Sequence, residues 1–198
     1  LDPEWAFHTE MSEIFHSVRD LHTNYLLPDP FAGKVAYLPF QVEEYFDDGG
    51  AAHCIVSRVV QGFVAAGFGR GAEVTHWNGV PIARAVERNG NRFAGSNAAA
   101  RHARGLGTLT IRPLVMHLPP DEEWVDVGYV GTDGVERELR QNWLVVENLP
   151  PFVGDMTEIS ATAAAQGLDL DGDEAGRARL LLYAPSVAGA VLADEGVR

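Results

Sequence analysis

The stretch GRGAEVTHWNGVPI, residues 69–82, carries the strongest fold signal in the chain. Its central letters, WNGV, indicate a β-hairpin, because an Asn-Gly pair such as Asn78-Gly79 readily adopts the positive φ angles of a tight two-residue turn. Strand patterns also dominate the sequence on either side of this hairpin.

Apolar and polar residues follow a two-residue period over much of the chain between residues 35 and 147. The turn DDGG at 47–50 and the turn GTDG at 131–134 each separate two candidate strands. The strand candidates besides the central hairpin are 35–46, 53–60, 107–116, 123–130 and 135–146. This pattern predicts a small barrel or sandwich of strands.

Two helices are expected, one before the strands and one among them. Apolar residues recur at helical spacing over residues 3–20, with Pro3 as the first helical residue after an Asp2 N-cap. The apolar stripe consists of Phe7, Met11, Ile14, Phe15, Val18 and Leu21. The short helix is expected near 96–104, with Ser96 as N-cap and Gly105 as its stop.

These patterns predict an α+β protein in three parts. Residues 1–34 form an N-terminal helical segment, and residues 35–149 form the strand-rich domain with one short helix against it. Residues 150–198 are rich in Ala, Gly and Asp, and they indicate a helical or linker tail, or the start of a following domain.

Composition narrows the function classes. A length of 198 residues, with 46% hydrophobic and 22% charged residues, is typical of a soluble globular protein. A net charge of −13 argues against a nucleic-acid partner, because phosphate binding needs clustered Lys and Arg. No apolar run reaches the roughly 18–20 residues needed to span a membrane. No signal peptide is visible, and the first residue is Leu1 rather than Met.

No metal or cofactor is expected. The seven histidines are scattered and show no His-x-x-x-His or His-Glu-x-x-His spacing. The stretch DLDGDEAG, residues 169–176, has alternating aspartates like a calcium loop. It has Glu174 where such a loop needs Gly and Leu180 where it needs Glu, so an acidic turn is the favoured interpretation. Cys54 is the only cysteine and excludes an internal disulfide.

Two segments carry a family resemblance. The stretch 69–82, followed after a gap by NAAARHARGLGTLTIRP at 97–113, resembles the PDZ modules of bacterial proteases. Upstream, VRDLHTNYLLP at 18–28 is similar to the Asp-x-His-Thr segment that precedes the PDZ module in the C-terminal processing and tricorn-type serine peptidase family. The resemblance covers roughly residues 5–147 and implies a PDZ-like fold for the strand-rich domain.

The resemblance implies a catalytic role for His22. In the tricorn-type branch, this histidine activates a serine that lies in a separate α/β domain after the PDZ module. Neutral imidazole is suited to take a serine proton near pH 7. That α/β domain is expected to be absent from these 198 residues, because no serine lies in a Gly-x-Ser-x-Gly elbow and Lys34, the only lysine, lies in a loop. The alternative for His22 is an interaction with the C-terminal dipole of the first helix.

The resemblance also implies a peptide-binding groove, in which an extended peptide adds a strand and backbone N–H groups hold its terminal carboxylate. By analogy the carboxylate loop falls at residues 37–41, where Pro39 has no N–H to donate. The residues expected to contact peptide are Leu38, Phe40, Gln41, Asn97, Arg101 and His102. The alternative is that the domain only orients a catalytic domain.

Two functions are therefore expected. The first is the non-catalytic N-terminal and PDZ-like portion of a serine endopeptidase, which positions a peptide or unfolded-protein substrate and contributes His22 to a nucleophile domain of the same parent chain. The second is a stand-alone PDZ-like peptide-binding or scaffold module without protease activity. The length of the parent reading frame discriminates between them. Export is implied by the family resemblance alone, and the sequence itself leaves the compartment open.

Overall fold

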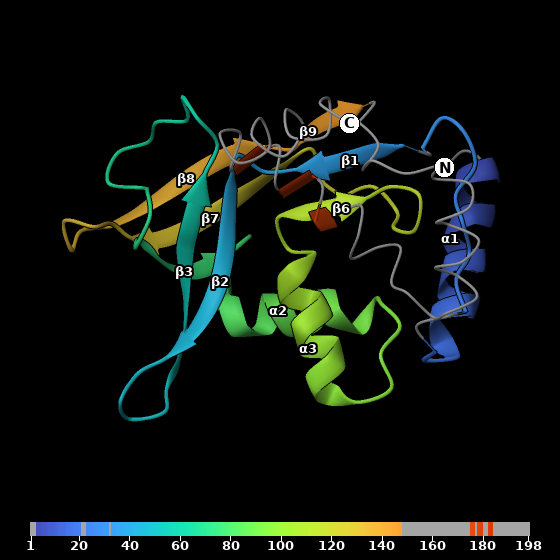
Figure 1. Ribbon diagram of the computed structural model, residues 1–198, viewed down its shortest axis with the longest axis horizontal. Helices are drawn as coiled ribbons and strands as arrows, with labels where there is room; N and C mark the ends of the chain where they lie inside the picture. Colours follow the sequence, from blue (N-terminus) through green and yellow to red (C-terminus); the bar gives the residue numbers. More distant parts are fainter. Residues whose placement is uncertain are drawn as a thin grey trace, which may run out of the picture.

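The computed structural model describes residues 3–20, 23–31, 33–147, 175–176, 178–179 and 182–183. It confirms an α+β protein with an N-terminal helix and a β-rich body of two sheets (Figure 1). The helices are α1 (Pro3–Ser17), α2 (Ile82–Asn91) and α3 (Ala98–Gly107). The strands are β1 (Lys34–Tyr37), β2 (Phe40–Phe46), β3 (Ala52–Val59), β4 (Glu73–Trp77), β5 (Val80–Pro81), β6 (Ile111–Pro113), β7 (Trp124–Val130), β8 (Glu136–Asn142) and β9 (Leu144–Glu147).

The larger sheet has the strand order β2-β3-β4-β7-β8, and β5 pairs with β4. The smaller sheet has the order β6-β1-β9. Every strand pair is antiparallel, so short turns suffice to connect neighbours such as β7 and β8. The helix α1 stands apart from both sheets, at the opposite end of the molecule from the β2–β3 hairpin (Figure 1).

One apolar core fills the body between the larger sheet and the helices. Strands β2, β3, β4 and β7 each turn alternate residues inward, and among these Phe40, Val56 and Val127 are fully buried. Val86 of α2 closes the core from the helical side. A second, smaller cluster joins Val35 and Ile111 of the smaller sheet to Ala175, Ala178 and Tyr183.

The hairpin predictions are confirmed. Asn78 and Gly79 connect β4 to β5 with φ angles of 48° and 76°, which are the left-handed values of a tight two-residue turn. The Asn78 side chain adds a second tie, because its Oδ1 accepts from the Asp126 N–H at 2.8 Å. The turn at 47–50 joins β2 to β3, and the turn at 131–134 joins β7 to β8.

The helical content differs from the prediction in one element. Within the described stretch 33–147 the structure forms two helices rather than one, because α2 occupies a stretch for which no helix was predicted. The predicted short helix is present as α3, but Asn97 rather than Ser96 caps it, through a hydrogen bond of 2.8 Å from the Ala100 N–H. Gly105 lies inside α3 rather than beyond its end.

The predicted long strand at 35–46 is two strands in separate sheets. The break falls at Leu38 and Pro39, where the Leu38 N–H donates to the Thr110 carbonyl at 2.9 Å instead of joining a ladder. The last predicted strand is also divided, because the chain leaves the larger sheet after β8 and pairs with β1 as β9. Both crossings connect the two sheets at the same end of the body.

Candidate functional site

Strand β2 forms one edge of the larger sheet. It pairs with β3 on one side, and no strand among the described residues pairs with its other side. The Asp47 N–H donates to the Ala51 carbonyl at 3.0 Å, which fixes which residues face β3. By strand alternation, the backbone groups of Val42 and Glu44 point toward the open edge. An edge of this kind can accept an added strand.

Helix α3 lies beside this edge, and one side-chain contact connects the two elements (Figure 1). His102 Nε2 lies 2.9 Å from a carboxylate oxygen of Glu44. The Glu44 side chain is mostly buried, whereas the His102 side chain is exposed on its outer side. The pair therefore ties the edge strand to the helix across the site where the sequence predicted a peptide.

The three predicted peptide contacts on the loop lie at the start of this edge. The side chains of Leu38 and Phe40 are fully buried in the core, so neither side chain is available to a ligand. The carbonyl oxygens of both residues accept hydrogen bonds from the Tyr183 hydroxyl, at 2.7 and 3.2 Å. Gln41 is half-buried at a β-bulge, and its amide donates to Glu43 at 3.0 Å.

The three predicted contacts on the helix lie at or near the N-terminal half of α3. Asn97 is occupied as the N-cap, and Arg101 donates to the Gly95 carbonyl at 3.0 Å. His102 is the member of this set that reaches β2, through Glu44. The structure thus brings together His102 and the strand that follows the loop, but it turns Asn97 and Arg101 toward their own helix and the turn before it.

His22 lies outside the described residues, so its predicted role stays a prediction. The described residues nearest to it are Asp20 and Thr23, and the Thr23 hydroxyl donates to the Asp20 carboxylate at 3.1 Å. Arg19 has a φ of 61° at the end of α1, and it donates to the carbonyl oxygens of Asn91 and Phe93. The segment before His22 is therefore anchored to the body at the end of α2.

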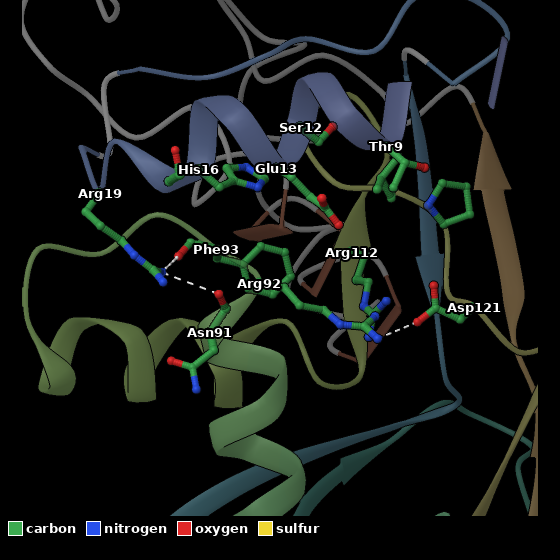
Figure 2. Close-up of a pocket in the computed structure, with 13 residues that line it drawn as sticks. Thr9, Ser12, Glu13, His16, Arg19, Asn91, Arg92, Phe93, Arg112 and Asp121 are labelled. Atoms are coloured by element: carbon green, nitrogen blue, oxygen red, sulfur yellow. Dashed lines mark hydrogen bonds and ion pairs between the residues drawn. The ribbon is translucent and has the colours of Figure 1, made fainter. Parts of the chain in front are cut away.

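A cavity of about 420 Å³, which no pattern in the sequence indicated, opens between α1 and the body (Figure 2). Its walls come from α1, the end of α2, strand β6 and the loop before β7. The lining residues with ionisable or hydroxyl groups are Thr9, Ser12, Glu13, His16, Ser17, Arg19, Arg92, Arg112 and Asp121. These residues are spread from Thr9 to Asp121, so no local motif joins them.

Arg112 is the deepest of the charged groups in this cavity. Its guanidinium donates to the Thr108 carbonyl at 3.3 Å and to the Asn89 side-chain oxygen at 3.2 Å, and it lies 5.3 Å from the centre of the Trp143 ring. Burial of the guanidinium, together with the nearby charge of Arg92, lowers the pKa of Arg112 to about 10. The side chain is therefore charged at neutral pH.

Among the described residues, no group of three or more His, Cys, Asp or Glu side chains is arranged to hold a metal ion. Cys54 is buried in the core, and burial raises the pKa of its thiol to about 11, so it is a poor nucleophile at neutral pH. None of the helices in the described part of the chain has the length and apolar character to cross a membrane.

Comparison with solved structures finds the same fold in part of a protease. The chain superposes on mature CPAF, a chlamydial serine protease with a PDZ-like region, with a TM-score of 0.52 and 22% sequence identity, over 78% of this chain and 27% of that one. CPAF complexed with lactacystin gives a TM-score of 0.51 at 22% identity, over 78% and 27% of the two chains. A serine-to-alanine mutant of CPAF gives 0.51 at 20% identity, over 85% and 30%.

This likeness shows a fold that occurs within a serine protease. The chain spans less than a third of the length of the CPAF chains that it matches. No family model matches the sequence, and no curated protein matches it either.

Proposed function

We propose that this chain is the substrate-handling, non-nucleophile portion of a serine peptidase, and that an extended peptide binds by adding a strand to the open edge of β2. The observation that supports this proposal best is the unpaired edge beside α3, in a fold that is shared with part of CPAF. Strand addition needs only main-chain groups that point outward, which Val42 and Glu44 supply. The bound peptide is therefore expected to be extended and to vary in sequence.

The contacts of the loop favour binding of an internal peptide segment over capture of a terminal carboxylate. Carboxylate capture needs several free backbone N–H groups. The Leu38 N–H is occupied by Thr110, and Pro39 has no N–H. An endopeptidase substrate presents internal segments, so the free part of the edge from Val42 onward suits that class of ligand.

The pair formed by Glu44 and His102 is proposed to limit access to the edge. It connects β2 to α3 on the side where a peptide would lie, so an added strand has to displace it. Removing the carboxylate while keeping the backbone N–H is expected to strengthen peptide binding. Removing the N–H is expected to abolish it.

His22 is proposed as the general base that activates a serine supplied by a nucleophile domain outside this chain. The resemblance of the segment 18–28 to the C-terminal processing and tricorn-type peptidases supports this role. The anchoring of Arg19 at the end of α2 supports it further, because a base needs a fixed position relative to the bound peptide.

The second candidate is a free-standing peptide-binding module, which the open β2 edge also supports because strand addition requires no second domain. The two functions differ in what surrounds the chain. A reading frame that continues beyond Arg198 into an α/β domain with a glycine-flanked serine supports the peptidase. A reading frame without such a domain supports the module.

Peptide binding can be tested with a fluorescently labelled, unstructured peptide and three variants of the chain. Glu44→Pro removes one outward N–H without touching the β2–β3 ladder, and it should abolish binding. Glu44→Ala keeps that N–H and should bind at least as tightly as the unmodified chain. The matched control is Glu138→Pro on β8, at the opposite edge of the larger sheet. The Trp143 N–H donates to the Glu123 carbonyl, so strand alternation turns the backbone groups of Glu138 outward. The Glu138→Pro variant should bind the peptide as tightly as the unmodified chain. Equal binding by all four proteins would exclude the β2 edge as the site.

A further inference from the structure

The cavity between α1 and the body is a second candidate site, distinct from the β2 edge. It holds about 420 Å³ and is lined by three arginines, which is unusual in a chain whose net charge is −13. Arg19, Arg92 and Arg112 reach it from three different segments, and Figure 2 shows Arg92 and Arg112 side by side. The Arg19 guanidinium lies apart from these two, beside Asn91 and Phe93 (Figure 2). Positive charge on both sides of one cavity suggests a site for an anion.

Two of these guanidinium groups already have strong partners. Arg92 forms an ion pair with Asp121 at the rim of the cavity. Arg19 donates to the Phe93 carbonyl at 2.9 Å and to the Asn91 carbonyl at 3.4 Å. Their charges contribute to the potential inside the cavity, and each side chain is held in place by these protein contacts.

Arg112 has no carboxylate partner among the described residues, which distinguishes it from Arg92. It differs from Arg19 because protein atoms enclose its guanidinium enough to lower its pKa. Its hydrogen bonds go to a carbonyl oxygen and to an amide oxygen, and its third contact is the Trp143 ring. Asp121 and Glu122 act on it only as more distant charges, and Arg92 opposes them. A buried cation that faces neutral groups is costly to fold, and an anion bound beside it would offset that cost.

A second, smaller cavity of about 150 Å³ is also lined by Arg112. It shares Arg92 and Arg112 with the first cavity and is lined further by Arg88, Asn89 and Glu122. Arg112 therefore borders two cavities, although protein atoms surround most of its guanidinium. This accessibility is what a ligand-binding arginine needs and a purely structural arginine does not.

The charge balance of the larger cavity selects a singly charged ligand. Its lining carries three arginines against the two carboxylates of Glu13 and Asp121, so its formal net charge is +1 with His16 neutral. A doubly charged phosphate would leave an excess of negative charge. Part of the remaining wall is apolar, formed by Phe93, Leu118 and Pro119.

We propose that this cavity binds a carboxylate that is carried on a short apolar group, with Arg112 as its principal contact. A planar carboxylate matches the fork of donors on a guanidinium, and the apolar group would pack against Phe93 and Leu118. The carboxylate can come from the C-terminus of a peptide or from an acidic side chain. This inference does not rest on peptide binding at the β2 edge.

Direct titration with small probes tests the ligand class. N-acetyl-leucine carries the carboxylate and an apolar group, and N-acetyl-leucinamide is its neutral counterpart. The acid should bind, as followed by calorimetry or by NMR shifts of residues that line the cavity, and the amide should not. Equal binding of the amide, or tighter binding of inorganic phosphate than of N-acetyl-leucine, would overturn the proposal. Glutamate blocked at both its amino and its α-carboxyl group then separates the sources, because tighter binding of it indicates a side-chain carboxylate.

Variants test the role of each charge. Arg112→Gln should weaken N-acetyl-leucine binding by about tenfold or more, because it removes a charge-assisted pair of hydrogen bonds. Glu13→Gln should strengthen binding, because it removes an opposing negative charge from an exposed position on α1. Arg70→Gln, which changes an exposed arginine outside the cavity, is the matched control and should bind normally.

The proposal stays testable if Arg112→Gln fails to fold. Glu13 is exposed on α1, so the Glu13→Gln variant is expected to fold. Its affinity for N-acetyl-leucine then tests whether the ligand occupies the cavity. Unchanged or weaker binding of N-acetyl-leucine by Glu13→Gln would place the ligand elsewhere. Loss of binding in Arg70→Gln to the same extent as in Arg112→Gln would show a non-specific charge effect and would also overturn the assignment.

Discussion

Gly90 of α2 and Gly105 of α3 meet backbone against backbone where the two helices cross (Figure 1). A β-carbon on Gly90 would lie 2.2 Å from the Arg101 carbonyl oxygen, and one on Gly105 would lie 2.3 Å from the Val86 carbonyl oxygen. Neither oxygen can move away without unwinding its helix. The crossing also brings Asn89 to the end of α3, where its side chain donates to the Gly105 carbonyl at 2.7 Å. The two helices are therefore one packed unit that holds α3 beside β2.

Gly105→Ala is expected to destabilise the fold, although alanine is the better helix former by about 1 kcal/mol. The added methyl group collides with backbone atoms, so the net loss should reach about 1–3 kcal/mol. Gly107→Ala in the same helix is the control, because its β-carbon would meet only the Arg179 side chain at 3.5 Å. Chemical denaturation of both variants measures the difference. Equal stability of the two would show that the crossing can relax.

The crossing explains why the sequence failed to predict α2. The stretch contains Asn89, Gly90 and Asn91, which favour turns over helix when judged locally. These residues stabilise the contact between the two helices, because Gly90 permits the close approach of α3 and Asn89 donates hydrogen bonds to the end of α3. The same contact explains why Gly105 lies inside α3 rather than ending it. Local propensity cannot reveal a residue whose role depends on a helix fifteen positions away.

Other features were predictable because their causes are local. The Asn78-Gly79 turn depends on two adjacent residues, and the β7–β8 hairpin depends on strand alternation around one turn. The break at Pro39 and the separation of β8 from β9 depend on which sheet each segment joins, which alternation does not encode. The cavity between α1 and the body was the least predictable feature, because its lining residues come from α1, the end of α2, β6 and the loop before β7.

Tyr183→Phe is expected to destabilise the loop before β2. The Tyr183 hydroxyl is buried and donates to the carbonyl oxygens of Leu38 and Phe40, which lose that donor in the variant. Leaving buried acceptors without a partner should lower the free energy of unfolding by about 1–3 kcal/mol. Thermal or chemical denaturation measures this loss. An unchanged stability would show that water replaces the hydroxyl at both carbonyls.

Tyr183 also gives the chain an alkaline sensitivity. Burial raises the pKa of Tyr183 above its usual value of 10.0, so the folded state holds this proton more tightly than the unfolded chain does. The resulting stability is complete below about pH 10 and decreases as the pH rises beyond the pKa of the unfolded chain. Tyr183→Phe lacks this proton. The stability difference between the two proteins should therefore shrink as the pH rises above about 10.

His53 on β3 is expected to titrate above its ordinary pKa of 6.5. Hydrogen bonds to Glu73 at 2.7 Å and to Asp47 at 3.3 Å raise the pKa of its imidazole, and the ring stacks on Tyr45. Its contribution to stability is present below pH 6.5 and is lost as the pH rises through the folded-state pKa. NMR titration of the ring protons measures this pKa directly.

Glu73→Gln should lower the pKa of His53, because Glu73 makes the largest contribution to the shift. Asp47→Asn should lower it by less. Asparagine keeps a side-chain oxygen that can accept from the Gly49 and Ala51 N–H groups, so the turn between β2 and β3 should stay intact. A pKa for His53 at or below 6.5 in the unmodified chain would contradict the hydrogen-bonded arrangement.

The purified 198-residue chain is expected not to hydrolyse peptides. Among the described serines, Ser17 and Ser57 each donate to a backbone carbonyl rather than to a histidine, so neither is placed beside a base. Incubation with an unstructured protein substrate and detection of new amino termini provides the test. Robust cleavage that is lost in Ser57→Ala, or in Ser186→Ala outside the described residues, would contradict the proposal that the nucleophile lies in another domain.

The proposed role of His22 makes the last prediction. If His22 is the base for a serine in another domain, the chain combined with that domain should lose turnover in His22→Ala, because an unassisted serine hydroxyl is a poor nucleophile at neutral pH. The same substitution should leave the melting temperature of this chain within about 3 °C, a shift that corresponds to roughly 1 kcal/mol for a protein of this size. The alternative, in which His22 stabilises the end of α1 through the helix dipole, predicts the reverse pattern of lowered stability and retained turnover. His22→Gln separates the two further, because glutamine can still donate to helix carbonyls but cannot take a proton from serine. Full activity of His22→Gln would exclude the general base, and full stability together with lost turnover would support it.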